Sequence, residues 1–192
     1  MELLNRPIGT VRSFFIPLDS QIPVVEPLIF VYHLWSPTIF LCGILFLYRQ
    51  RELGRRYFFS LALAQLQANI FFIFCQTQVP RLPLEDLSSS LAGRLIEYTY
   101  RIDNHYCGFP SIHVSLCTIL IVFIWQAPVK IITKWVITLW MILIAATTVL
   151  VKQHVILDIP GGVANGLLAY GLILLVQRLY RLMIVDRRPN LS

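Results

Sequence analysis

The chain has little charge and lacks the residue patterns of soluble proteins. Only 14% of its 192 residues are charged, whereas 57% are hydrophobic, and the mean hydropathy is +0.69. Soluble domains carry about 25% charged residues, and the apolar residues here come in long blocks rather than in amphipathic stripes. These features exclude an ordinary soluble protein and favour a single integral membrane domain over residues 1–192.

The sequence also lacks the cysteine spacing of a metal site. The four cysteines form no CxxC pair, so we do not expect a zinc site. Cys42 and Cys117 lie inside apolar blocks and are expected to be packing residues. Cys75 and Cys107 could share a membrane face, where a disulfide is an open alternative. We also expect no secretory signal peptide, because the first residues lack a basic start followed by an apolar stretch and a cleavage site.

The long apolar blocks predict an all-α fold, a multi-span transmembrane helical bundle. A helix needs about 20 apolar residues to span a bilayer, and five blocks reach or approach that length. The segment before Pro27 contains prolines and charges, so we expect an N-terminal interfacial segment there, with a sixth span as the alternative. The five predicted spans are Pro27–Tyr48, Tyr57–Cys75, Ser111–Gln126, Ile131–Val151 and Pro160–Leu182.

The net charge of +6 is explained by membrane topology. Basic residues concentrate in cytoplasmic segments of membrane proteins, and more than half of the 16 here fall in the loops after the first and third predicted spans and in the C-terminal tail. There, only Glu52 and Asp186 offset them. We therefore place these segments in the cytoplasm and expect no nucleic-acid partner. The basic residues assigned to this side are Arg49, Arg51, Arg55, Arg56, Lys130, Lys134, Arg178, Arg181, Arg187 and Arg188.

The remaining two loops, residues 76–110 and 152–159, then share the extracytoplasmic face and bring polar residues together. His154 and Asp158 are four residues apart, which puts them in contact on one face of a helix, although Pro160 favours a helix that starts late or bends. A carboxylate bonded to one imidazole nitrogen makes the other a better base or nucleophile. His113, at the start of the third span, could protonate a leaving group.

The same loops offer ligands for a phosphate. Arg81 and Lys152 supply positive charge, and Ser111 with the backbone N–H groups after it resembles an anion site at a helix N-terminus. A further group could shape the pocket or bind a headgroup: Asp103, Asn104 and His105. No cluster of carboxylates is available for Mg²⁺, so we expect a metal-free mechanism with no cofactor.

Each of these residues also has a structural interpretation. A histidine at the end of a span can cap backbone carbonyls, Lys152 can be a snorkelling anchor, and Arg81 can be an interfacial charge. Ser111 can be a helix N-cap alone. For the residues at 103–105, the polarity of a surface loop is the alternative.

Three short motifs in these loops resemble those of a known family. PSIH at Pro110–His113 resembles the PSxH motif of the type 2 phosphatidic acid phosphatase superfamily, the membrane lipid phosphate phosphatases. HVILD at His154–Asp158 resembles the HxxxD of its third motif, and PRLP at Pro80–Pro83 a degenerate form of its first. The order of the motifs and their position on two loops of one membrane face also match, over roughly Arg81 to Gly162.

The resemblance implies a role for each matched residue. His154 would be the nucleophile that forms a phosphohistidine, and Asp158 would orient it. His113 would be the general acid for the departing lipid hydroxyl, and Arg81 and Ser111 would bind phosphate oxygens. The implied substrate is a phosphomonoester or diphosphate of a membrane lipid, and we expect a bacterial inner membrane location. The sequence leaves the oligomeric state open.

The chain departs from the family pattern at two phosphate-binding positions. Phe74 stands where the first motif has a lysine, and Thr147 and Thr148 stand where the third has Ser-Arg. Lys152 is the candidate replacement for that arginine, but lysine cannot bind a phosphate bidentately. These losses leave two alternatives to the phosphatase: a lipid phosphotransferase of the sphingolipid-synthase type, or a non-catalytic membrane protein or transporter of the same fold.

Overall fold

The computed structural model describes residues 6–7 and 9–185. The predicted cytoplasmic residues Asp186, Arg187 and Arg188 lie outside this range. In chain order, the elements are β1 (Arg12–Ser13), α1 (Pro17–Gln21), α2 (Leu28–His33), α3 (Trp35–Arg49), α4 (Arg51–Phe74), β2 (Thr77–Gln78), the 3₁₀ helix η1 (Leu84–Asp86), α5 (Leu91–Ile102), α6 (Ile112–Gln126), α7 (Ile131–Leu150) and α8 (Asp158–Val185).

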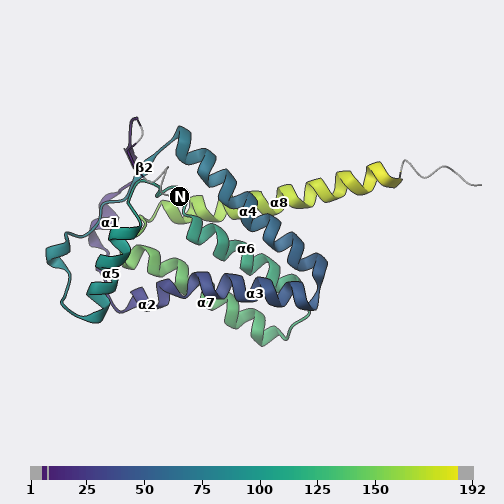
Figure 1. The fold of residues 1–192 in the computed structure, drawn as a ribbon, viewed down its shortest axis with the longest axis horizontal. Helices are drawn as coiled ribbons and strands as arrows, with labels where there is room; N and C mark the ends of the chain where they lie inside the picture. Colours follow the sequence, from purple (N-terminus) through teal and green to yellow (C-terminus); the bar gives the residue numbers. More distant parts are fainter. Residues whose placement is uncertain (1–5, 8, 186–192) are drawn as a thin grey trace, which may run out of the picture.

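The long helices form a bundle around α6, which packs against α3, α4, α7 and α8. Helix α6 is apolar along its whole length and supplies fully buried residues such as Ile119, Leu120 and Phe123, as expected of a helix enclosed on all sides. The short elements α1, α5 and β2 gather at one end of the bundle, whereas α8 extends beyond the opposite end (Figure 1). The predicted all-α bundle is confirmed; β1 and β2 add only a two-residue parallel pairing.

Among the described residues, four helical segments are long and apolar enough to cross a membrane: Leu28–Arg49, Arg51–Phe74, Ile131–Leu150 and Asp158–Met183. They overlap four of the five predicted spans. The remaining predicted span coincides with α6, whose 15 residues make a helix about 22 Å long, shorter than the roughly 30 Å hydrocarbon core. The chain is an integral membrane protein.

Two boundaries differ from the prediction. The basic segment after the first span was expected to be a loop, but α4 begins at Arg51 and only Gln50 separates it from α3. Arginine and glutamate are good helix formers, so α4 continues past the apolar block. The first span is divided at Leu34 into α2 and α3, because Pro37 has no N–H for the carbonyl of His33 and its ring crowds that carbonyl.

The N-terminal segment does not add a span within the described residues; it packs onto the end of the bundle where α5 lies (Figure 1). Residue Arg12 of β1 pairs with Thr77 of β2, and Asp19 of α1 is buried. Cys75 and Cys107 are not joined by a disulfide, the option that the sequence left open.

Small residues bring α6 and α8 close together. A Cβ atom on Gly162 would lie 2.6 Å from the carbonyl oxygen of Ser111, and one on Gly166 would lie 2.6 Å from that of Ser115. This spacing of glycines four residues apart lets membrane helices approach closely. Between them, Asn165 donates to Ser115 Oγ at 3.0 Å and to the carbonyl of Ala64 on α4 at 3.1 Å. Asn165 thereby links α8 to both α6 and α4.

We expect Gly166→Ala to destabilise the protein by about 1–3 kcal/mol, the usual cost of overpacking, because backbone must move to admit the methyl group. Gly171→Ala on the same helix is the matched control, since nothing lies within 4 Å of a Cβ there. Thermal unfolding of the detergent-purified variants measures both. Equal melting temperatures for the two variants would contradict the close packing of α6 on α8.

Candidate active site

The loop between α7 and α8 is shaped by the way α7 ends. Lys152 adopts the left-handed conformation with φ of 54°, its N–H donates to the carbonyl of Val149, and the N–H of Gln153 donates to that of Thr148. This is the Schellman arrangement of a helix C-terminus. The N–H of His154 donates to the same Thr148 carbonyl, at 3.0 Å. The cap therefore fixes the backbone from which the His154 side chain projects.

His154 and Asp158 are in contact, but not on one helix as the spacing predicted. His154 lies in the loop and Asp158 is the first residue of α8. The Asp158 carboxylate accepts hydrogen bonds from His154 Nδ1 and from the backbone N–H of Val155, each at 3.0 Å. The helix starts late because a proline fits only its first turn, where Pro160 needs no N–H partner. Both side chains are buried, with exposures of 6% and 1%.

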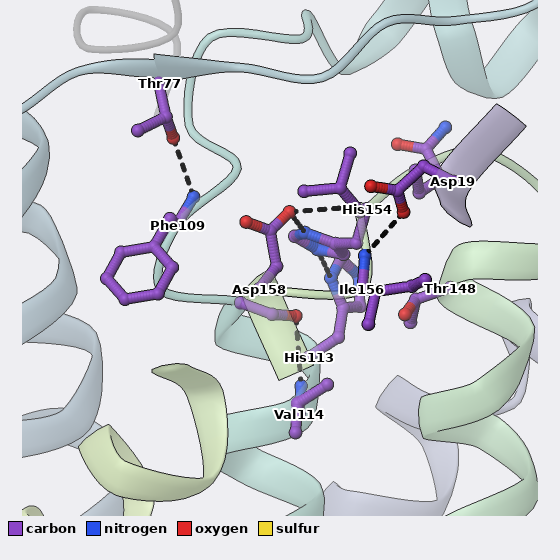
Figure 2. A network of polar contacts seen from close by, with 12 residues as sticks. Asp19, Thr77, Phe109, His113, Val114, Thr148, His154, Ile156 and Asp158 are labelled. Atoms are coloured by element: carbon purple, nitrogen blue, oxygen red, sulfur yellow. Dashed lines mark hydrogen bonds and ion pairs between the residues drawn. The ribbon is translucent and has the colours of Figure 1, made fainter. Parts of the chain in front are cut away.

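The second histidine reaches His154 from α6. His113 Nδ1 lies 3.3 Å from His154 Nε2, and Figure 2 shows His154 between Asp158 and His113. The N–H of Ser111 donates to the carbonyl of Asp158 at 3.3 Å, which joins the start of α6 to the start of α8. The structure thus brings together the three residues that were predicted to do chemistry.

A further hydrogen bond extends this set to the N-terminal part of the chain. The Tyr32 hydroxyl on α2 lies 2.9 Å from His113 Nε2. An ionised carboxylate only accepts, so His154 Nδ1 carries a proton and Nε2 accepts. His113 Nδ1 must then donate, and its Nε2 accepts from Tyr32. With both imidazoles neutral, the hydrogen bonds therefore form one directional chain from Tyr32 through His113 and His154 to Asp158.

Arg81 is held beside these residues by backbone and side-chain acceptors. Nη1 donates to the carbonyls of Tyr100, at 3.0 Å, and Asp103, and Nη2 donates to Gln153 Oε1 at 3.0 Å. The guanidinium also lies over the Tyr100 ring, 4.6 Å from its centroid, a favourable cation–π geometry. Burial lowers the pKa of Arg81 and the Asp103 charge opposes this; the group stays protonated.

A small pocket joins these side chains. Its volume is about 30 Å³, room for a water molecule or two and far below the 300–1,000 Å³ of sites that enclose a drug-sized ligand. Burial lowers the pKa of His105, and the charge of Arg81 lowers it further, so this imidazole is neutral at pH 7. The pocket is lined by Val79, Arg81, Asp103, Asn104, His105, Cys107, Gly108, Ile112, His113, Gln153 and His154.

Two predicted phosphate ligands are placed differently. Lys152 is not among the pocket residues: its Nζ donates to the carbonyls of Asp19 and Ile22, both at 2.8 Å, because the left-handed backbone directs it to the N-terminal segment. Ser111 is fully buried and accepts the N–H of Val114 at 3.3 Å, so it is the N-cap of α6 and does not line the pocket either. Asp103, Asn104 and His105, in contrast, do line it.

The loop also depends on Asp19, which the sequence analysis did not single out. Its Oδ2 accepts the N–H of Ile16 at 2.9 Å, as in a capping box, and its Oδ1 accepts the N–H of Ile156 at 2.8 Å (Figure 2). Tyr32 and Gln153 were missed as well. The signals available were a tyrosine inside a predicted span and a glutamine directly before His154, both weak without knowledge of which segments meet.

No group of three or more His, Cys, Asp or Glu side chains in a metal-binding arrangement occurs among residues 6–7 and 9–185. The polar side chains that line the pocket are three imidazoles, two amides and one guanidinium, with one carboxylate and one thiol. This set is suited to binding an anion rather than a hard cation, which prefers oxygen ligands.

Fold and site together define a helical membrane protein in which two histidines and a carboxylate meet beside a small polar pocket. The chain belongs to the PAP2 superfamily, whose sequence pattern matches residues 9–172; the family resemblance of the motifs is thereby confirmed. The fold is similar to that of Aquifex aeolicus LpxE, with a TM-score of 0.63 and 19% sequence identity over 86% of this chain and 99% of LpxE. No curated protein sequence matches the chain.

We expect Asp19→Ala to loosen the loop that carries His154. The variant leaves the N–H of Ile156 without its acceptor, at a cost of about 1 kcal/mol, the low end of the range for buried groups, because this bond is only partly buried. Amide hydrogen exchange of residues 152–157 should become faster. Asp86→Ala, at an exposed position in η1, is the matched control. Unchanged exchange in the Asp19 variant would show that the N-terminal segment does not hold this loop.

Proposed function

We propose that the protein is a membrane lipid phosphate phosphatase that hydrolyses a phosphomonoester or diphosphate of a lipid through a phosphohistidine at His154. The observation that carries the proposal is the buried contact of His154 with Asp158 on one nitrogen and with His113 on the other. Membership of the PAP2 superfamily supports the same reaction class.

In the first step, His154 Nε2 attacks phosphorus and the bond from phosphorus to the lipid oxygen breaks. Asp158 stabilises the positive charge that develops on the imidazole as the N–P bond forms. A phosphomonoester that enters as its monoanion brings a proton, which passes to His113, and the resulting imidazolium gives this proton to the departing lipid oxygen. In the second step, His113 takes a proton from water, hydroxide attacks phosphorus, and the N–P bond breaks to restore His154. The His113 imidazolium then gives its proton to the departing phosphate, which leaves as the monoanion.

Tyr32 suits both protonation states of His113. A hydroxyl both donates and accepts: it donates to Nε2 in the resting tautomer, and it accepts from Nε2 once the substrate has displaced Nδ1 from His154 and the neutral imidazole carries its own proton on Nε2. Nδ1 is then the nitrogen that gains and loses the catalytic proton, while the contact at Nε2 persists. The contact between the two histidines does not persist: the phosphoryl group must displace the N–H of His113 from His154 Nε2 before attack. Catalytic hydrogen bonds often rearrange in this way when substrate binds.

The size of the pocket supports a lipid as the substrate. With a volume of about 30 Å³ it has room for part of a phosphoryl group at most, so the rest of the substrate must remain outside, where the bundle meets the bilayer. The mechanism requires neither metal nor cofactor, since imidazole is itself the nucleophile.

The distribution of basic residues supports an extracytoplasmic site. In Figure 1 the α3–α4 turn, the α6–α7 loop and the end of α8 lie at the end of the bundle away from α1, α5 and β2. That end carries Arg49, Arg51, Lys130 and Arg178, as expected of a cytoplasmic face. We propose that the protein resides in a bacterial inner membrane with the pocket on the opposite side.

The proposal predicts phosphate release by the detergent-purified protein from a panel of lipid phosphates in EDTA. His154→Ala should abolish release, and the wild-type protein quenched during turnover should carry acid-labile phosphate on histidine. The matched control is His33→Gln, since His33 bonds Thr99 at 2.9 Å and does not line the pocket. Full activity of His154→Ala, or activity that EDTA removes, would contradict the mechanism.

The same assay separates hydrolysis from transfer to another lipid. Phe74 and Thr148, the departures from the family pattern, are the observations that keep a phosphotransferase as the second candidate. Phosphate that appears on an added lipid alcohol instead of in solution would favour it.

Tyr32→Phe should lower kcat roughly tenfold and change KM little. The variant loses one hydrogen bond to the His113 imidazolium, worth about 1.5 kcal/mol at the low end for a charged partner, and 1.4 kcal/mol corresponds to a factor of ten in rate. Steady-state kinetics on the best lipid phosphate measures the effect, with the exposed Tyr98→Phe as control. An unchanged kcat would remove Tyr32 from the mechanism.

A further inference from the structure

Two buried donors at the pocket have no hydrogen-bond partner among the described residues: Gln153 Nε2 and Arg81 Nε. Gln153 is only 4% exposed, so water does not satisfy its amide freely. An unsatisfied buried donor costs about 1–3 kcal/mol, and such groups are rare enough in folded proteins to require an explanation. Both residues line the same pocket. In each, the other polar atoms of the side chain are hydrogen-bonded, and the atom without a partner is an N–H donor.

The orientation of the Gln153 amide is determined by Arg81. A guanidinium has donors and no acceptor, so the amide atom 3.0 Å from Arg81 Nη2 must be the oxygen. The NH₂ group is therefore directed away from Arg81. The backbone of Gln153 is fixed as well, because its N–H donates to the Thr148 carbonyl in the cap of α7. The unpartnered N–H is thus a preorganised donor.

The charge of the pocket makes neutral donors important. Arg81 and Asp103 are the charged residues in its lining, and their charges offset each other. Lys152, the candidate replacement for the arginine of the third motif, is occupied by the N-terminal segment. A phosphoryl group bound here would therefore depend on short-range hydrogen bonds, and the two unpartnered donors lie beside His154.

We propose that Gln153 is a phosphate ligand, whose Nε2 binds a non-bridging oxygen of the phosphoryl group together with Arg81 Nε. It supplies, from the residue directly before the nucleophile, a donor in place of the arginine missing at Thr148. The inference rests on the proposed function for the identity of the substrate, but not for the binding of an oxyanion.

Gln153→Glu tests it with little change in shape. The variant keeps an acceptor oxygen for Arg81 and replaces the NH₂ group by a carboxylate oxygen that repels phosphate. Gln153→Met removes both polar atoms. Gln78→Glu makes the same charge change at an exposed residue of β2 near the same end of the bundle and is the control.

The full chain in detergent is titrated with orthovanadate and with inorganic phosphate, and the shift in melting temperature gives the affinity for each oxyanion. Phosphate release from a lipid phosphate gives KM and kcat.

We expect oxyanions to stabilise the wild-type protein and the Gln78 variant alike. Gln153→Glu should raise the dissociation constant for orthovanadate at least tenfold, and Gln153→Met should raise it less. The KM for the lipid should rise in the same order. Without ligand, the melting temperature of Gln153→Glu should stay near that of the wild type. Unchanged oxyanion affinity in both variants, or no oxyanion binding by the wild type, would overturn the inference. Oxyanion binding that depends on Gln153, without hydrolysis of any lipid phosphate, would support this ligand and contradict the phosphatase.

Discussion

The carbonyl of Thr148 accepts the N–H groups of both Gln153 and His154, and the geometry of the site depends on this cap. The cap ends α7 and turns the chain, so that the successive side chains of Gln153 and His154 both line the pocket. The cost is a lysine in the left-handed conformation, which an L-residue other than glycine seldom adopts. The Lys152 side chain offsets that cost by its two bonds to the N-terminal segment. A residue that the sequence presented as a phosphate ligand thus has a structural role in positioning His154.

The N-terminal segment is a working part of the site rather than a surface addition. Its Asp19 binds the backbone of the His154 loop, and Tyr32, at the start of the first span, binds His113. Each end of the row of hydrogen-bonded groups is therefore fixed by a different element: Tyr32 by α2 and Asp158 by the start of α8. In a low-dielectric setting such a row is stabilising only when every member is satisfied, and the four side chains from Tyr32 to Asp158 meet that condition.

Much of this arrangement could be predicted from the sequence. Long apolar blocks predicted the helices, since burial in a bilayer requires them, and the order of PSIH and HVILD predicted that His113, His154 and Asp158 would meet. The starts of α4 and α8 could not be placed, because the charged residues at 51–56 favour helix as readily as loop, and because Pro160 was compatible with either a late start or a bend. The roles of Asp19, Tyr32 and Gln153 could not be predicted, since each follows from a contact between segments distant in sequence.

The lining of the pocket carries little net charge, and under the proposed function this determines how affinity for a phosphate is gained. The opposite charges of Arg81 and Asp103 largely cancel at a distance, so an approaching phosphate gains little until it enters the pocket. Inside, donors fixed in advance by the protein need not reorganise as negative charge moves from phosphorus to the departing oxygen, which is the most effective form of electrostatic stabilisation in enzymes. Relative to the family pattern, the chain has lost cations at Phe74 and Thr148. The remaining cation in the pocket lining, Arg81, fixes the amide of Gln153, so one charge orients both of the proposed phosphate ligands.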